Sequence, residues 1–227
     1  MRRMRAMATD HLAMLRLLTW LSPSFPVGAF SYSHGLEFAV HDKTVIARAA
    51  LAEWIEDLIG WGSLWNDAVL LAEAWRAASQ ADIPRLRRVA EWGEAMALSM
   101  ERHLETMDQG RAFRAAAQSW TDSSGHDFPM PYPIAVGTAA AAMKIGLEPV
   151  SVAYLHACAA NLVSAGIRLI PLGQSEGTAL MASLEDLIIT VAHKAADSSL
   201  ADLGSATFAA DMAAMRHEIL PVRLFRS

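Results

Sequence analysis

Apolar residues recur every three or four positions along most of this 227-residue chain, a spacing that is typical of helices with one buried face. The predicted helices, in chain order, run through residues 36–39, 44–61, 67–78, 84–100, 100–120, 134–145, 149–169, 178–196 and 209–218. Thr44 and Asp82 are the expected caps of the second and fourth of these helices. Alternating runs of Val, Ile and Thr between turns do not occur, so no sheet is expected. The pattern predicts an all-α fold, a single globular helical bundle of about ten helices.

Turn-forming residues show where the predicted bundle is interrupted. Residues 121–125 are mostly polar and end in glycine, and the prolines within 129–133 then separate two halves of the chain. We treat the whole chain as one domain, in which residues 1–8 are expected to be flexible. Residues 197–207 are rich in Asp, Ser and Gly, and this composition predicts a mobile loop.

Residues 21–37 (LSPSFPVGAFSYSHGLE) have unusual backbone requirements for so short a segment. The two prolines fix φ and make the segment stiff, while Gly28 and Gly35 permit positive φ or a close approach of another backbone. Ser31 or Ser33 is a candidate cap for the helix that follows. A well-packed connection between two helices is the better explanation of these features on physical grounds alone, and a functional surface is the alternative.

The C-terminal residues 215–227 also differ from an ordinary chain end. Most termini are polar and loosely held, whereas here Arg223 and Arg226 enclose a leucine and a phenylalanine. This composition predicts a tail that docks on a surface.

Composition favours a protein that works with partners. The chain is 53% hydrophobic, with seven Trp and twelve Met, and a mean hydropathy of +0.23. Apolar surface in excess of one core predicts self-association, and we expect a twofold homodimer in which the helix at 149–169 forms the contact. A net charge of −5 argues against nucleic-acid binding.

Cysteine content and hydropathy also indicate a compartment. The single cysteine, Cys158, excludes an intrachain disulfide and suits a reducing environment. The basic start of the chain does not continue into the apolar run of a signal peptide. The uncharged run 149–167 is long enough to span a bilayer, but it contains His156 and Asn161 and is better explained as a buried core helix. We therefore expect a cytoplasmic protein with no membrane partner.

No catalytic constellation is recognisable. A G-x-S-x-G elbow is absent, and the glycine-flanked segment 173–178 lacks the lysine of a phosphate-binding loop. No two histidines stand four residues apart, so a closed intrachain metal site is not expected, although histidines of two protomers could meet across a symmetry axis. Cys158 lies among alanines and fits a small core residue.

Two arginines lie in largely apolar helical sequence. Arg111 and Arg168 need acceptors there, which an internal ion pair would supply; the alternative is presentation at an interface. Gln109 and Gln174 each flank a glycine, where either could cap its own helix or bind a partner backbone.

Four stretches, in this order, carry a resemblance to a known family: SPSFPVGAFSYSHGLE, QGRAF, NLVSAGIRLIPLGQ and the terminal RLFRS. Together they span residues 15–227, and the chain resembles the UreF family of urease accessory proteins. Two departures concern Thr178, where the family usually has Gln, and Pro221-Val222, where it commonly has Tyr-Ser. The second departure alters the backbone just before the tail, because proline removes an N–H and fixes φ.

The resemblance implies an all-α homodimer that joins the accessory protein UreD (called UreH in some organisms) and the GTPase UreG on apo-urease. There it would help to deliver nickel, which the complex handles transiently, and the chain itself would hold no cofactor. We expect the tail to fold back near residues 30–32, to give Tyr32 a guanidinium or carbonyl partner, and to form one surface for UreG or UreD. The expected partner-binding residues are Tyr32, Glu37, Arg111, Arg168, Gln174, Arg223, Leu224, Phe225 and Arg226.

Two rival functions belong to other classes. An all-α enzyme would hold carboxylates or His103 as general acid or base in a deep pocket, and would turn over a substrate alone. A membrane-surface protein would use the basic N-terminus and apolar helices to bind vesicles.

Overall fold

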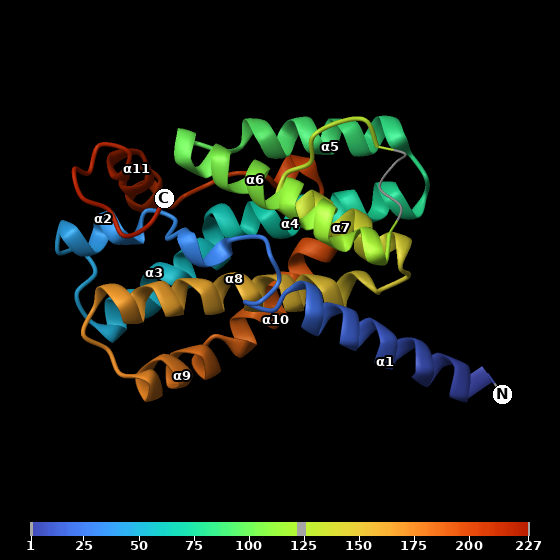
Figure 1. The fold of residues 1–227 in the computed structure, drawn as a ribbon, viewed down its shortest axis with the longest axis horizontal. Coiled ribbons are helices and arrows are strands. Elements are labelled where there is room, and N and C mark those ends of the chain that lie inside the picture. Colours follow the sequence, from blue (N-terminus) through green and yellow to red (C-terminus); the bar gives the residue numbers. More distant parts are fainter. Residues whose placement is uncertain (1, 122–125, 227) are drawn as a thin grey trace.

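A computed structural model describes residues 2–121 and 126–226 of the chain, and for residues 2–10 only the backbone. The described residues form eleven α-helices, three short 3-10 helices and no strand, which confirms a single all-α domain (Figure 1). The α-helices are α1 (Arg2–Trp20), α2 (Leu36–His41), α3 (Arg48–Trp61), α4 (Ser63–Ser79), α5 (Ile83–Ala95), α6 (Met100–Ala116), α7 (Tyr132–Ala142), α8 (Leu147–Leu169), α9 (Gln174–Ser183), α10 (Glu185–Asp197) and α11 (Phe208–His217). The 3-10 helices are η1 (Ala29–Ser31), η2 (Ala117–Ser119) and η3 (Leu200–Asp202).

Helix α4 lies at the centre of the bundle, and α3, α5, α7, α8 and α10 all pack against it (Figure 1). Its apolar residues belong to two buried clusters, with Leu64 in one and Leu71 in the other. Helix α8 also contributes to both clusters, through Leu162 and Val150 respectively. Because α4 and α8 each run through both clusters, the two halves of the chain share one continuous core.

Two glycines allow helices to approach more closely than a side chain would permit. A Cβ on Gly137 of α7 would lie 2.5 Å from the carbonyl oxygen of Leu71 on α4. A Cβ on Gly110 of α6 would lie 1.9 Å from the carbonyl oxygen of Met130, just before α7 begins. Both distances are shorter than any van der Waals contact, so these positions require glycine for packing.

The predicted helix at 44–61 begins later than expected, and its predicted cap is wrong. Helix α3 starts at Arg48, because Thr44 belongs to the turn that ends α2. In that turn the N–H of Thr44 donates to the carbonyl of Ala39 at 2.9 Å, and Lys43 has a φ of 64°.

The predicted helix at 84–100 starts correctly but ends too late. Asp82 caps α5 as predicted, since its carboxylate accepts the N–H of Arg85 at 2.9 Å. The helix stops before residue 100 because Ser99 begins the next helix: its hydroxyl accepts the N–H of Arg102 at 3.1 Å and so caps α6.

The single helix predicted at 178–196 is wrong, because the structure has two helices, α9 and α10, that meet at Leu184. Leu184 is fully buried, and its N–H donates to the carbonyl of Met181 at 3.2 Å. The turn lets both helices pack against α8. The other predicted helices are present, with ends within four residues of those expected.

Helix α1 is not among the predicted elements. Figure 1 shows it projecting from the body of the molecule, with the N-terminus at its far end. Leu17 and Trp20, near its C-terminal end, are buried, whereas Leu12, Leu15 and Leu18 are exposed. The exposed leucines leave an apolar face of α1 uncovered in the isolated chain.

Three segments are predicted to be flexible or to form turns or loops. The backbone of residues 2–8 continues α1, and the flexibility expected there stays a prediction. The segment 197–207 contains η3 and hydrogen-bonds to α4, since the N–H of Gly204 donates to Asn66 Oδ1 at 2.9 Å; its mobility likewise stays a prediction. Most of the predicted turn at 121–125 lies outside the described residues.

One described helix, α8, is long and apolar enough by length and composition to cross a membrane. Half of its most apolar window is buried inside the molecule, and α8 packs on α4, α9 and α10. This packing is that of a core helix.

Candidate functional site

The segment between α1 and α2 brings its backbone close to the C-terminal region. Gly28 and Gly35 have φ values of 75° and 78°, as their positions predict. A Cβ on Gly35 would lie 2.6 Å from the backbone nitrogen of Ala214, so only glycine lets α2 begin this close to α11. Ser33 supports the first turn of α2 as expected, because its hydroxyl accepts the N–H of Glu37 at 3.3 Å.

The C-terminal tail docks on this segment. The N–H of Arg226 donates to the carbonyl of Ser31 at 2.7 Å. Arg168 of α8 donates to the carbonyl of Phe30 at 2.8 Å, and its guanidinium covers the ring of Phe225 at 4.2 Å. The tail therefore folds back onto residues 30–32, as the sequence predicts.

Tyr32 lies beneath the docked tail and receives the expected guanidinium partner. Its side chain is 5% exposed, and the side chain of Arg226 hydrogen-bonds to its hydroxyl. Burial raises the pKa of Tyr32, and the hydrogen bond from Arg226 opposes this only in part.

The side chain of Glu37 anchors the tail by accepting hydrogen bonds from the tail backbone. One carboxylate oxygen accepts the N–H of Leu224 at 2.6 Å, and the other accepts the N–H of Phe225 at 2.9 Å and His217 Nε2 at 2.8 Å. Burial alone would raise the pKa of Glu37, but these hydrogen bonds outweigh burial and lower it. Glu37 is therefore an ionised carboxylate inside the molecule.

His217 joins three elements at the same point. Its side chain is fully buried, and its Nδ1 lies 2.6 Å from Glu101 of α6, opposite Glu37 of α2. The other oxygen of Glu101 pairs with the guanidinium of Arg223. The next residue, Glu218, accepts the N–H of Met100 at 2.7 Å and so supports the start of α6.

A second polar cluster lies deeper, around Glu105. This carboxylate accepts hydrogen bonds from His34 at 2.8 Å and Gln109 at 3.0 Å, and it forms an ion pair with Arg102. Burial alone would raise the pKa of Glu105, yet Arg102 and His34 lower it to about 2. The same arrangement raises the pKa of Arg102, because Glu105 and Asp67 outweigh its burial.

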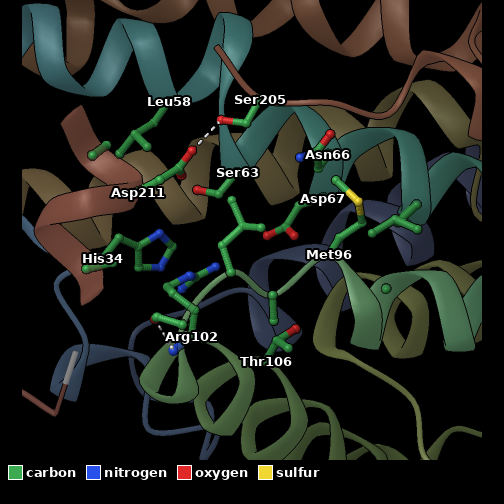
Figure 2. A pocket seen from close by; sticks show the side chains of 17 residues that line it. His34, Leu58, Ser63, Asn66, Asp67, Met96, Arg102, Thr106, Ser205 and Asp211 are labelled. Carbon is green, nitrogen blue, oxygen red and sulfur yellow. Dashed lines mark hydrogen bonds between the residues drawn. The ribbon is translucent and has the colours of Figure 1, made fainter. Parts of the chain in front are cut away.

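Asp67 of α4 completes this cluster beside a small cavity. Figure 2 shows His34, Asp67 and Arg102 turned toward one another around it. Asp67 accepts the hydroxyl of Tyr154 at 3.0 Å, and burial raises the pKa of Asp67. The cavity volume is about 50 Å³, which is room for a few water molecules.

Metal-ligating groups, the single cysteine and His103 bear on the catalytic alternative. No group of three or more His, Cys, Asp or Glu side chains among them is placed to hold a metal ion. Burial raises the pKa of the Cys158 thiol, so this side chain stays protonated and is a poor nucleophile. His103, the general acid or base of the enzyme alternative, lies at the surface 3.1 Å from Glu94.

The predicted partner-binding residues divide into two groups. Three are internal: Tyr32, Glu37 and Phe225 are each at most 9% exposed. The exposed ones are Arg111, Arg168, Gln174, Arg223, Leu224 and Arg226. The internal residues hold the tail in place, and only the exposed group is accessible at the surface; contact of either group with a partner stays a prediction.

The structure also shows which hydrogen-bond and ion-pair partners the two arginines and two glutamines singled out in the sequence have. Arg111 is 80% exposed rather than in apolar surroundings, and it pairs with Asp108 at 2.7 Å. Arg168 forms no ion pair with any residue that the structure describes, and instead uses a backbone carbonyl and the Phe225 ring. Gln109 binds Glu105 rather than a helix end. Gln174 begins α9 without capping it, since the preceding Gly173 N–H donates to a glutamate side chain.

The sequence interpretation missed the role of His217 and of the buried Glu101 and Glu105. A signal was present for both. Every fourth residue along one face of α6 is buried: Glu101, Glu105, Gln109 and Phe113. Helix α6 therefore turns a largely polar stripe toward the core. His217 continues the buried face of α11 that Ala210, Ala213 and Ala214 form.

Comparison with known proteins decides the family. A family model described as UreF matches residues 45–185. Urease accessory protein UreF of Rhizobium etli (strain CFN 42) is 53% identical over 217 residues, which cover 95% of this chain and 96% of that protein. The chain belongs to the UreF family. UreF of Rhizobium johnstonii is 54% identical with the same coverage, and UreF 1 of Brucella suis biovar 1 is 52% identical over 95% of this chain and 94% of its own length.

The UreF match covers only part of the two polar clusters around His217 and Glu105. The matched residues 45–185 include α6 and α8, which carry Glu101, Glu105 and Arg168. Glu37 and His217 lie on either side of that range, and the fold brings them together. The tail-docking site is therefore assembled from the matched core and from both ends of the chain.

Proposed function

We propose that this chain is a non-enzymatic urease accessory protein that joins UreD (UreH) and the GTPase UreG on apo-urease and helps to deliver nickel. Membership of the UreF family supports the proposal, since the relatives are named urease accessory proteins. In this proposal the protein works in the cytoplasm, and nickel is handled transiently by the assembled complex.

The docked tail is the observation that carries the proposal. The side chains of Ile219, Val222 and Leu224 are 81%, 85% and 62% exposed, although the tail backbone is held by the hydrogen bond of Leu224 to Glu37 and that of Arg226 to Ser31. An ordered segment that turns apolar side chains outward next to Arg226 has the composition of a protein-binding surface. We call Ile219, Val222, Leu224 and Arg226 the tail surface.

Helix α11 extends the tail surface with a second exposed apolar face. Phe208, Met212 and Met215 are 72%, 52% and 47% exposed and recur at helical spacing. An apolar area of this kind is costly for a chain that works alone. We assign UreD or UreG as the protein that covers it.

Action on the GTPase would use one of two routes. The chain can order the switch segments of the GTPase, or it can insert an arginine that stabilises charge on the transferred phosphoryl group. Arg111, Arg168, Arg223 and Arg226 are exposed and are candidates for the second route. Substituting each in turn by alanine separates the routes: loss of the rate effect with intact binding identifies an arginine finger.

Self-association is part of the same proposal. Small residues of α8, Ala153 and Ala157, line an apolar groove of about 710 Å³ together with Leu18 of α1 and Pro23. Helices with small residues approach one another closely, and the groove continues into the exposed leucines of α1. We propose that a second copy of the chain covers this groove.

Co-expression with the urease structural and accessory proteins tests the function. Urease purified from cells that lack this chain should contain intact apoenzyme with little nickel and little activity, and adding back the chain should restore both. Full nickel loading without the chain, at the same apoenzyme level, would contradict the proposal. Measurable GTP hydrolysis by the purified chain alone would contradict its non-enzymatic nature.

A further inference from the structure

The geometry around His217 fixes its charge. Both ring nitrogens face carboxylates, Nδ1 toward Glu101 at 2.6 Å and Nε2 toward Glu37 at 2.8 Å. An ionised carboxylate only accepts hydrogen bonds, so each nitrogen has to donate one. A neutral imidazole carries a single N–H, and only the imidazolium satisfies both carboxylates.

The four elements that meet at His217 contribute two negative and two positive side chains. Helix α2 contributes Glu37, α6 contributes Glu101, α11 contributes His217, and the tail contributes Arg223, which pairs with Glu101. The nearby Glu218 is directed to the backbone at the start of α6. Two buried carboxylates thus face two cations, and removing one charge leaves an unpaired partner away from water.

The tail is tied to this cluster by its backbone rather than by its exposed side chains. The N–H groups of Leu224 and Phe225 both end on Glu37, whose second oxygen also meets His217. Ionised Glu37 accepts all three hydrogen bonds as charge-assisted bonds, and the imidazolium holds it in place. Protonation would remove that charge and put a proton on one oxygen, where it opposes the N–H donors.

We propose that Glu37, His217 and Glu101 are positioning residues for the tail: a carboxylate–imidazolium–carboxylate bridge whose charge state decides whether residues 224 and 225 stay docked. The inference concerns the isolated chain and does not depend on the identity of any partner. It assigns to His217 a role in holding the tail in the orientation that exposes Leu224.

The bridge predicts how docking depends on pH. The pKa of Glu37 is lowered in the folded protein, so the stabilisation it gives is complete above its unfolded value of 4.5. That stabilisation is lost as the pH falls through the lower, folded pKa. The contribution of Glu105 declines below the same pH of 4.5 and on down to its folded pKa of about 2, but the core is also held by its two apolar clusters, which do not titrate. Acid should therefore release the tail before the core unfolds.

Hydrogen exchange of the full-length chain tests the inference. Protection of the Leu224 and Phe225 amides, corrected for intrinsic rates, is measured between pH 7 and pH 3, with α4 amides as the reference for the core. We expect tail protection to fall by about tenfold to a hundredfold, the range that loss of a charge-assisted hydrogen bond gives, while the α4 amides, whose protection declines as Glu105 titrates, remain protected. Equal tail protection at both ends of this range would overturn the proposal.

Variants separate positioning from general stability. Glu37→Gln keeps the shape but cannot hold a charge, and should show low tail protection with no pH dependence. The matched control Glu56→Gln, at an exposed position of α3, should keep the wild-type profile. Wild-type tail protection in Glu37→Gln would refute the bridge. The same loss of tail protection in acid in Glu37→Gln and Glu56→Gln would also refute it. The wild-type pH profile decides the question by itself if Glu37→Gln does not fold.

Discussion

At positions 37, 101 and 105, glutamate side chains face the inside of the molecule, and each meets a positively charged partner or a histidine. A buried charge costs several kcal/mol unless it is paired and hydrogen-bonded. Glu105 satisfies this condition with Arg102, His34 and Gln109. Glu105 thereby holds α6 against its neighbours, and its substitution should affect stability rather than surface contacts, whereas substitution of Glu37 or Glu101 should release the tail.

Glu105→Ala is predicted to be among the most destabilising single substitutions. It would leave the guanidinium of Arg102 and the ring of His34 without their carboxylate, at a cost of about 3–5 kcal/mol in the free energy of unfolding. Urea denaturation measures this cost. Glu53→Ala, at an exposed position of α3, is the control and should change the unfolding free energy by less than about 0.5 kcal/mol.

The same carboxylate predicts acid sensitivity. Its pKa is about 2 in the folded protein, against 4.5 as the reference value, so its contribution to stability is present above pH 4.5 and is lost as the pH falls toward 2. The difference corresponds to about 3 kcal/mol. Wild-type stability should therefore fall over this interval, and Glu105→Gln should show a shallower fall. Parallel curves for the two proteins would count against the assignment.

At the scale of helices, close packing between α6 and the start of α7 depends on a glycine. Gly110→Ala places a Cβ against the carbonyl of Met130 and should lower the unfolding free energy by at least about 2 kcal/mol. Gly60→Ala in α3 meets nothing within 4 Å and should raise it by about 0.5–1 kcal/mol. Thermal unfolding of both variants gives the comparison, and the same sign for both would contradict the packing account.

Local sequence predicted the helices whose signals are local. The cap at Asp82 and the positive φ of Gly28 and Gly35 follow from side-chain chemistry within a few residues. The break at Leu184 could not be predicted in this way, because its cause is the packing of two helices on α8. Helix α1 was missed because its polar and basic first half carries no clear apolar face.

The candidate site was only partly predictable, for a related reason. The docking of the tail near Tyr32 followed from the composition of the two segments and from the family resemblance. The bridge joins His217 to Glu101, which is 116 positions away in the chain, and to Glu37, which is 180 positions away. No periodicity links such positions, and only the fold brings them together.

At the scale of the whole molecule, an uncovered apolar groove between α1 and α8 predicts a dimer. Light scattering at micromolar concentration should give twice the 24.6 kDa mass of the chain. Ala157→Arg places a charge in the groove and should produce a monomer, while Ala182→Arg on the exposed side of α9 should remain dimeric. A monomeric wild-type chain would refute this assembly.

The central claim is that the docked tail presents a surface through which this UreF-family protein acts on its partners. The most direct measurement is urease activation and nickel content in cells that co-express the urease proteins with either the wild-type chain or Leu224→Asp. Leu224 is 62% exposed, so the variant should keep the wild-type melting temperature. The account predicts at least about a tenfold loss of activation, as for removal of a central interface residue. Full activation and nickel loading with Leu224→Asp would contradict it.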